Sequence, residues 1–313
     1  MLMRQPVVID TDAGVDDALA LILALRSPEL DIKAITTVAG NVPVHQCTRN
    51  VMAILDQLHA DSRLVVAQGA AKPLVRRLVT APEVHGRDGF GNARPKKRTF
   101  RTISPLPADS VIAQTCREWG KKLTLIALGP LTNIALALRR YPRLVKRVGR
   151  LITMGGAFRV PGNTGPVAEF NYYVDPEAAQ AVLTSGIPIS IIPLDLTQQL
   201  VIMHSELERR AQRRANQLSG LIVRMTKFYM KYHDRTEHFF GGFLHDPIAV
   251  AAAIRPSMFH TQRLRVEIET EGILTRGMSI ADFRKKASGH GVDVALKFDK
   301  EQFLKLFHER LWE

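Results

Sequence analysis

Residues 6–18 of this chain read PVVIDTDAGVDDA, and this stretch decides more about the fold than any other. An apolar run that ends at Ile9 precedes four aspartates, and a second apolar run, Ala18 to Leu25, follows them. This order predicts a strand, a tight turn and then a helix. Gly14 lies in the turn, where we expect it to supply the positive φ that such turns often need.

The four aspartates of this turn are Asp10, Asp12, Asp16 and Asp17. Residues two apart on a strand end point the same way, and acids that open a helix face its favourable dipole. Two like charges 4 Å apart repel by roughly 4 kcal/mol at an effective dielectric of about 20. A helix cap explains one such acid but not four. The cluster therefore predicts a bound cation, raised pKa values or both, and its oxygen ligands suit Ca²⁺ or Mg²⁺ better than zinc.

The composition is that of a globular protein with a substantial core. The chain has 313 residues, of which 46% are hydrophobic, and none of its apolar runs reaches the roughly 18 residues of a membrane span. The N-terminus leads directly into the first predicted strand and leaves no room for a signal peptide. Cys47 and Cys116 lie far apart in helix-like segments, which indicates buried thiols. We therefore expect a cytoplasmic protein without a membrane partner.

The charge is strongly basic, with 43 Lys and Arg against 30 Asp and Glu, a net +13. The basic residues gather in three stretches, Lys72 to Arg101, Arg139 to Arg150 and Arg209 to Arg214. Such stretches attract polyanions, but they are also typical of solvated helix faces and loops, which we favour. Aromatic residues are 6% of the chain and do not alternate with the basic ones, and we recognise no zinc-finger or RNP-type motif. We therefore do not expect a nucleic-acid partner.

Strand-like and helix-like segments alternate along most of the chain. The patterns predict strands over 30–38, 63–67, 123–128, 151–154 and 187–194, and helices over 44–58, 108–119, 131–140 and 176–184. Two helices follow within 205–233, then short β-like runs over 264–298 and a last helix over 300–311. Residues 80–103 lack periodicity and predict a long loop. The alternation predicts an α/β fold, an open, mostly parallel, Rossmann-like sheet with helices on both faces, as a single domain over 1–313.

Polar motifs follow several predicted strands, where ligands bind in such sheets. They are TVAGN at 37–41, GPLTN at 129–133 and MGG at 154–156. Later, Asp246 begins a helix with Pro247 in its first turn, as either a cap or a ligand, and His245 beside it is either a core residue or a functional one. Asn163, Glu169 and Asn171 suit hydroxyl recognition, although Asn163 also fits a turn and Asn171 a helix cap.

Together, the segments DTDAGVDD, TTVAGN, ALGPLTNIA, MGG, AEFN and HDP resemble the inosine–uridine-preferring nucleoside hydrolases, most closely the bacterial ribonucleoside hydrolases. They occur in the same order from Asp10 to beyond Asp246. The resemblance implies a Ca²⁺ at the bottom of an active-site cleft, with Asp12, Asp17, Asp246 and the backbone carbonyl of Leu128 as ligands and Asp10 as a supporting acid. Relatives usually carry Pro where this chain has Ala13, so we expect a less rigid turn.

The resemblance also implies an activity, the hydrolysis of the N-glycosidic bond of ribonucleosides to ribose and free base. Asp12 would be the general base toward a metal-bound water, and His245 would lie near the departing base as a general acid. The ribose would be bound by Asp16, Asn41, Asn163, Glu169 and Asn171, with Met154 lining the pocket and His85 on the base side. Similar proteins form homodimers or homotetramers.

These residues leave the base preference open, with purine nucleosides, pyrimidine nucleosides or both as substrates. The predicted helix over 221–233 borders the base pocket if Tyr229, Tyr232 and His233 face it, and they are equally well ordinary helix-face residues.

Two alternatives belong to other classes. Phosphatases of the haloacid dehalogenase type also carry Asp-x-Asp after a strand, but they want Thr or Val where this chain has Gly14, and they have no use for Asp16 and Asp17 as a pair. The other alternative is a catalytically inactive nucleoside- or polyanion-binding protein on the same fold. Calcium removal discriminates, because it should abolish hydrolysis, whereas polyanion binding would respond to salt.

Overall fold

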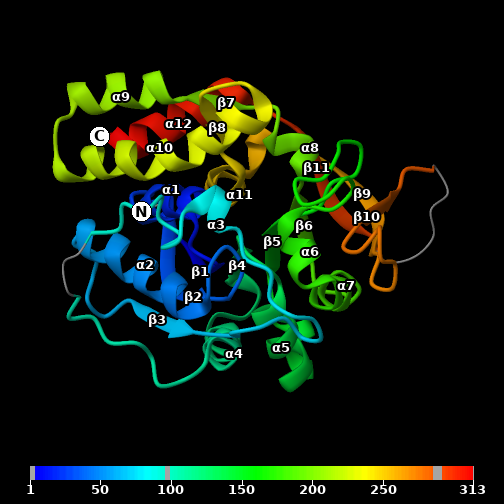
Figure 1. Cartoon of the computed structure of the whole chain (residues 1–313). Helices are drawn as coiled ribbons and strands as arrows, with labels where there is room; N and C mark the ends of the chain where they lie inside the picture. The colour runs from blue at the N-terminus through cyan, green and yellow to red at the C-terminus, as the bar shows by residue number, and fades with distance from the viewer. Residues whose placement is uncertain (1–3, 96–98, 285–290, 313) are drawn as a thin grey trace.

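A nine-stranded sheet runs through the molecule, with its strands in the order β10-β9-β11-β6-β5-β4-β1-β2-β3 (Figure 1). The computed structural model describes residues 4–95, 99–284 and 291–312. Neighbouring strands are parallel from β3 to β11, and only β9 and β10 add antiparallel pairs at one edge. The strands are β1 Gln5–Thr11, β2 Leu30–Thr37, β3 Val65–Gln68, β4 Thr124–Ala127, β5 Arg150–Met154, β6 Ile189–Ile192, β9 Phe259–Ile268, β10 Ser279–Asp282 and β11 Val292–Phe298. The predicted fold class is confirmed.

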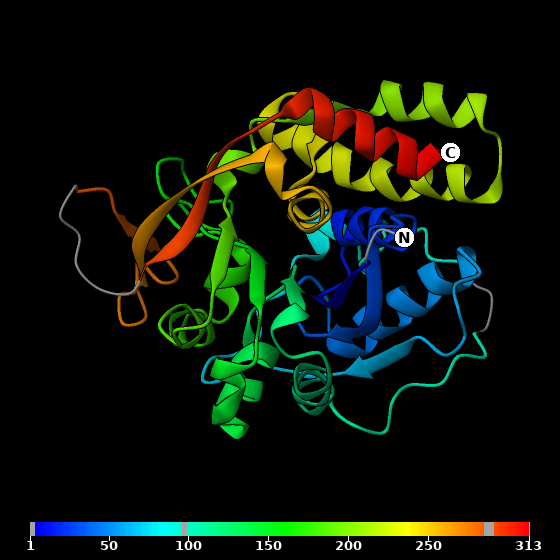
Figure 2. The same cartoon turned by 180° about the vertical axis from the view of Figure 1, so that it is seen from behind.

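Helices cover both faces of this sheet because successive strand residues point to opposite sides. In β1, Val7 and Ile9 pack into one apolar cluster and Val8 into the other. The first cluster includes α1 (Val15–Leu25), α2 (Val44–Gln57), α11 (His245–Ile254) and α12 (Lys300–Trp312), and the second includes α4 (Ala108–Trp119), α5 (Thr132–Arg140) and α7 (Pro176–Leu183). Figures 1 and 2 show α9 (His204–Arg213), α10 (Gln217–Glu237) and α12 as a further layer beyond α1 and α11.

Several short elements were not predicted. The expected strand over 187–194 ends at Ile192, because Pro193 has no N–H for the ladder, and the four-residue helix α8 begins at Leu194. The long loop over 80–103 contains the short helix α3, and residues 96–98 of its basic stretch lie outside the described ranges. The remaining elements are α3 Pro82–His85, α6 Phe170–Val174, α8 Leu194–Thr197, the pair β7 Val201–Met203 and β8 Gly241–Phe243, and the 3₁₀ helices η1 Gly120–Lys122, η2 Pro142–Lys146 and η3 Pro256–Met258.

The chain changes direction across the sheet between β1 and β4. From β1 it moves outward through β2 to β3, then returns to β4 on the other side of β1 and continues to β5 and β6. In open α/β sheets the carboxyl ends of two such strands bound the crevice where ligands bind. The aspartate-rich turn follows β1, and Leu128 follows β4. The strand order therefore places the predicted site at this crevice.

Two predictions from composition are also answered by the structure. Within the described ranges, no helix combines the length and the apolar character that a membrane crossing requires. Cys47 and Cys116 are both buried and free, as predicted.

Candidate active site

The turn between β1 and α1 is held by the side chains of Thr11 and Asp17. The Thr11 hydroxyl donates to Asp17 Oδ1 and accepts the backbone N–H of Ala13 at 3.1 Å. Asp17 Oδ2 accepts the backbone N–H of Gly14 at 2.8 Å. These bonds satisfy the amides at the start of α1 and aim the carboxylates of the helix N-terminus at the crevice. Thr11 was not predicted as a site residue, although it lies inside the motif that decides the fold.

The prediction of a positive φ at Gly14 is wrong. Gly14 has φ −74°, and Ala13 takes the left-handed conformation instead, with φ 46°. Gly14 is needed for space, because a Cβ there would lie 2.5 Å from Asn41 Nδ2 and 2.7 Å from His85 Nδ1. Proline is fixed near φ −65° and does not fit the conformation of Ala13. A proline at position 13 would therefore not fit the backbone of this turn.

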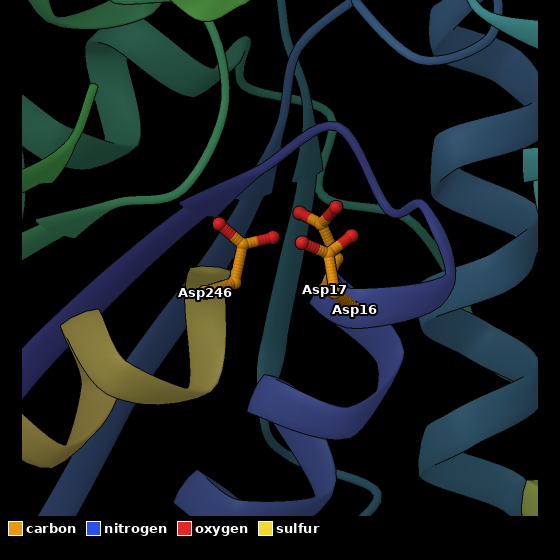
Figure 3. A group of neighbouring side chains, drawn as sticks. All are labelled: Asp16, Asp17 and Asp246. Atoms are coloured by element: carbon orange, nitrogen blue, oxygen red, sulfur yellow. The ribbon is translucent and has the colours of Figure 1, made fainter. Parts of the chain in front are cut away.

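Three carboxylates converge above this turn, as Figure 3 shows for Asp16 and Asp17 at the start of α1 and Asp246 at the start of α11. One oxygen from each lies within 4.8 Å of the others. Asp12 is fully buried beside them, with Oδ2 accepting the Asn41 N–H at 2.7 Å and Oδ1 without a partner among the described residues. An unpartnered buried oxygen and three converging carboxylates fit a hard cation, and they form an acidic cluster able to hold a metal ion.

The charges of this cluster are strongly coupled. Burial, followed by repulsion from Asp17, raises the pKa of Asp12 well above its ordinary value and that of Asp16 to about 8. Burial also raises the pKa of Asp17, and burial followed by repulsion from Asp16 raises that of Asp246. At neutral pH such a group of acids requires either protons or a cation. The raised pKa values that the sequence predicted are therefore present.

Asp10 lies behind the cluster rather than at the crevice surface. Its Oδ1 accepts hydrogen bonds from the Thr36 hydroxyl at 2.5 Å and from Asn133 Nδ2 at 2.8 Å. Burial raises the pKa of Asp10 to about 7, although both hydrogen bonds lower it. Asn133 also donates to the carbonyl of Thr37 at 3.0 Å, so it ties the ends of β1 and β2 together. Thr36 and Asn133 were not predicted as site residues, but Asn133 closes the quoted GPLTN motif.

A cavity of about 360 Å³ opens above the acids. Its walls include these ten predicted site residues: Asp16, Asn41, His85, Leu128, Met154, Asn163, Glu169, Asn171, His245 and Asp246. Asp10, Asp12 and Asp17 are not on its surface. No Lys or Arg is among the described residues that line it, so the described parts of the three basic stretches contribute no positive charge to its walls. A larger surface groove of about 920 Å³ lies at the amino ends of β1 and β2 and contains none of these acids.

The wall predicted to bind ribose is tied to the backbone around it. Glu169 caps α6, accepting the N–H of Asn171 at 2.8 Å, and it also accepts the N–H of Gly156 at 3.1 Å. Burial raises its pKa to about 7. Asn171 donates to the Leu128 carbonyl at 2.8 Å and to the Met154 carbonyl at 3.2 Å. The cap of α6 is therefore Glu169, and Asn171, which the sequence left open as a cap, instead bridges the ends of β4 and β5.

Asn163 and Asn41 are held from the two sides of the cavity. Asn163 lies on the exposed loop before α6, where its Oδ1 accepts the N–H of Phe170 at 2.9 Å. Asn41 follows β2 and donates from Nδ2 to Asp17 Oδ2 at 3.2 Å. Both side chains line the cavity, so the predicted polar residues from distant parts of the chain do come together there.

The far wall of the cavity is built from imidazole and phenol rings. His85 and His245 are buried there, and burial lowers the pKa of each to about 3, while burial lowers that of His233 to about 4. Tyr229 stacks against His85 with ring centroids 5.7 Å apart and meets His233 edge-on at 4.7 Å. Tyr229, Tyr232 and His233 all line the cavity, which favours the pocket interpretation of this helix over that of an ordinary outer face.

In both His85 and His245, the Nδ1 atom of the ring makes a hydrogen bond. His85 Nδ1 accepts the backbone N–H of Val15 at 3.1 Å, so the neutral ring carries its proton on Nε2. His245 Nδ1 lies 2.7 Å from the hydroxyl of Thr197, at the end of α8. Neither partner was foreseen from the sequence, because Val15 contributes only its backbone and Thr197 belongs to a helix that was not predicted.

Comparison with known proteins gives a family for this fold and site. The family model described as "Inosine-uridine preferring nucleoside hydrolase" matches residues 7–305. The pyrimidine-specific ribonucleoside hydrolase RihA of Salmonella enteritidis is 40% identical over 312 residues, covering 99% of each chain. RihA of Escherichia fergusonii is 39% identical over 311 residues, again covering 99% of each chain.

Solved structures agree in fold. A plant nucleoside hydrolase superposes with a TM-score of 0.90 at 33% identity, covering 99% of both chains. A purine-preferring ribonucleoside hydrolase of Gardnerella vaginalis superposes with a TM-score of 0.92 at 32% identity, covering 98% of both chains.

This chain therefore belongs to the inosine-uridine preferring nucleoside hydrolase family. It is an enzyme that acts on N-glycosyl compounds and hydrolyses ribonucleosides, in the class of the bacterial ribonucleoside hydrolases it resembles. The family and the reaction expected from the sequence are confirmed. The phosphatase alternative fails, because the whole chain superposes on nucleoside hydrolases.

Proposed function

We propose that the enzyme uses Ca²⁺, held by Asp12, Asp17, Asp246 and the Leu128 carbonyl, with Asp10 behind them. The observation that carries this proposal is the set of carboxylates at the floor of the cavity and buried beneath it, including the unpartnered Oδ1 of Asp12. An all-oxygen donor set suits Ca²⁺. The Leu128 carbonyl already accepts one hydrogen bond from Asn171, and a second lone pair is available. Asp16, which we assign to ribose, lies close enough to Asp17 and Asp246 to share the ion.

Bound Ca²⁺ would lower the pKa of a water molecule and orient the ribose hydroxyls. In this proposal Asp12 accepts the proton of the attacking water at Oδ1, which has no other partner among the described residues. The surrounding carboxylates stabilise the positive charge that grows on the ribose in the oxocarbenium-like transition state. Asp16, Asn41, Asn163, Glu169 and Asn171 hold the ribose hydroxyls, and Met154 packs against the sugar. Several of these side chains are tied to backbone groups, which preorganises the site.

The histidines serve the departing base. In this proposal the Thr197 hydroxyl donates to Nδ1 of His245, so Nε2 carries the N–H that we assign to the departing base. His85 presents an N–H at Nε2, because its Nδ1 accepts from Val15. A donor at this position pairs with an oxygen or nitrogen acceptor of the base. Tyr229 and His233 complete an aromatic wall against which a planar base would stack.

The substrate class follows from the charge of the cavity. The charged residues that line it are all acidic, Asp16, Glu83, Glu169, Glu237 and Asp246, and no described lining residue is Lys or Arg. A 5′-phosphate would find no Lys or Arg side chain among the described lining residues, so we propose neutral nucleosides rather than nucleotides as substrates. The relatives with 39–40% identity are named pyrimidine-specific, which supports uridine and cytidine as the preferred nucleosides. Their 2′-deoxy analogues would leave buried polar groups unpaired and should be poor substrates.

Release of reducing sugar tests this proposal. Uridine, cytidine, inosine and adenosine are compared with and without a calcium chelator, and 2′-deoxyuridine and uridine 5′-phosphate serve as matched substrate controls. We expect chelator-sensitive ribose release, fastest from the pyrimidines and at least about a hundredfold slower from the deoxy analogue. Sugar release that survives removal of Ca²⁺ and other divalent cations would contradict the metal assignment. Equal cleavage of the nucleotide would contradict the substrate class.

We also propose one catalytic domain over 1–313, working as a homodimer or homotetramer in the cytoplasm. The family match over 7–305 and the continuous sheet support one domain, and the two free buried thiols suit a reducing compartment. Light scattering should give two or four times the chain mass of 34.9 kDa. A monomer at micromolar concentration would contradict the oligomer, and recovery of the enzyme outside the cytoplasmic fraction would contradict the location.

A further inference from the structure

Thr197 is the one hydrogen-bond partner that the described residues offer to the ring of His245. Its hydroxyl lies 2.7 Å from Nδ1, and no other hydrogen bond to this imidazole is present in the described part of the chain. Thr197 is fully buried, and His245 is 8% exposed. The nearest aromatic contact of the imidazole is Phe243, with ring centroids 5.5 Å apart, which packs against the ring without selecting either nitrogen. The orientation of the imidazole therefore depends on one hydroxyl.

The helix that carries this hydroxyl is itself fixed. α8 follows β6 directly, and the Leu194 N–H donates to the Gly156 carbonyl at 2.9 Å. The Asp195 carboxylate accepts the N–H groups of Phe158 and Arg159, each at 2.8 Å. These bonds join α8 to the segment after β5, at the same end of the sheet as the acids. Thr197 therefore lies on a helix that is held in place by backbone and side-chain hydrogen bonds, and not on a mobile loop.

We propose that Thr197 is a positioning residue for base departure, an inference that rests on the proposed function of His245. By holding Nδ1, Thr197 keeps Nε2 directed into the cavity, where the base leaves. As the C1′–N bond breaks, its electron pair goes to the base, which leaves with a hydrogen bond from the Nε2–H of the neutral imidazole and takes its proton from solvent water. Water supplies the new oxygen on C1′, and Asp12 takes the proton that this water loses. Without the hydroxyl, a half-turn of the ring would interchange its nitrogen and carbon edges.

The test compares two substrates whose leaving groups differ in how much they need a hydrogen-bond donor. Uridine releases uracil, a leaving group that must be stabilised as it departs. The substrate 4-nitrophenyl β-D-ribofuranoside releases 4-nitrophenolate, which is stable without such help. Thr197→Val, which keeps the shape and removes the hydroxyl, should lower kcat on uridine by about 10–100-fold, with little change in KM. Its kcat on the aryl riboside should stay within about threefold of wild type. Thr197→Ser, which restores the hydroxyl, should recover most of the uridine rate.

Thr115→Val is the matched control. Thr115 is also buried and its hydroxyl donates within its own helix, to the Val111 carbonyl at 2.9 Å, but it lies on α4 away from the cavity. This variant should leave kcat unchanged on both substrates. A double-mutant cycle with His245→Ala completes the test, because Thr197→Val should lower kcat no further in a chain that lacks the imidazole.

Three outcomes would overturn the inference: an unchanged uridine rate in Thr197→Val, an equal loss on both substrates, or independent losses in the cycle. Thermal melts identify a Thr197→Val variant that does not fold, and Thr197→Ala then takes its place in the same comparisons. A wild-type enzyme that releases no ribose from any nucleoside refutes the proposed function together with the inference. An active wild type whose Thr197 variants match it refutes the inference alone.

Discussion

Gly14→Ala tests whether the close packing of the active-site turn controls activity. The backbone at Gly14 has φ −74°, which alanine adopts without strain, so the substitution introduces only a methyl group. That methyl would lie 2.5 Å from Asn41 Nδ2 and 2.7 Å from His85 Nδ1. Ordinary contacts of a methyl carbon are about 3.5–4.0 Å, so each neighbour must retreat by roughly 1 Å.

Neither neighbour retreats freely. The backbone N–H of Asn41 donates a hydrogen bond to Asp12 Oδ2, and His85 Nδ1 accepts the backbone N–H of Val15. We expect a stability loss of about 1–3 kcal/mol, which is typical of an overpacked core. We expect kcat/KM to fall by about a hundredfold, because a displacement of about 1 Å at a catalytic group has that effect. Chemical denaturation measures the first quantity, and ribose release from uridine measures the second.

Gly220→Ala is the control, since Gly220 lies in α10 and a Cβ there meets only the flexible end of Arg224, at 3.1 Å. This variant should keep full activity and gain about 0.5–1 kcal/mol, because alanine favours a helix interior over glycine. If Gly14→Ala is as active as Gly220→Ala, the reasoning from close contacts is refuted. A Gly14→Ala enzyme that loses stability but not activity would show that Asn41 and His85 do not depend on this packing.

Three further predictions concern the same turn and the acids around it. Asp246→Asn should weaken Ca²⁺ binding by at least about tenfold in isothermal titration, and an unchanged affinity would exclude Asp246 as a ligand. Burial raises the pKa of Asp16 from 3.8 to about 8, so the stability that its proton contributes is complete below about pH 4 and is lost as the pH rises through 8. The rise in Tm caused by Ca²⁺ should therefore be larger at about pH 8.5 than at pH 5, and the reverse order in thermal melts would contradict the acid site. Ala13→Gly should stabilise the protein by about 1 kcal/mol because it relieves the left-handed φ of 46°, whereas Ala13→Pro should destabilise it by about 3 kcal/mol or more, and equal unfolding free energies for the two variants would contradict this backbone.

The long elements were predictable because each depends on local pattern. The helix predicted over 108–119 forms with those bounds as α4, and the strands around the acidic turn form within a few residues of their predicted ends. The predictions failed for short elements and for residues with unusual backbone conformations. α8 has four residues and no apolar period of its own, and its position follows from packing against the segment after β5. Similarly, the positive φ that was expected at Gly14 occurs at Ala13 instead, because the space left by Asn41 and His85 is a tertiary property.

The sequence by itself determined the class of fold, the acidic motif and the reaction that its family performs. These depend on periodicity, on charges close together in the chain and on motifs that keep their order. The resemblance already implied that Asp17 and Asp246 share an ion, but only the tertiary structure decided that Asp16 lies with Asp246 and that Thr197 meets His245. Each of these contacts joins residues that the strand order brings to one end of the sheet from separate parts of the chain. No local pattern carries that information, because a side chain's neighbours across a crevice depend on which strands lie side by side.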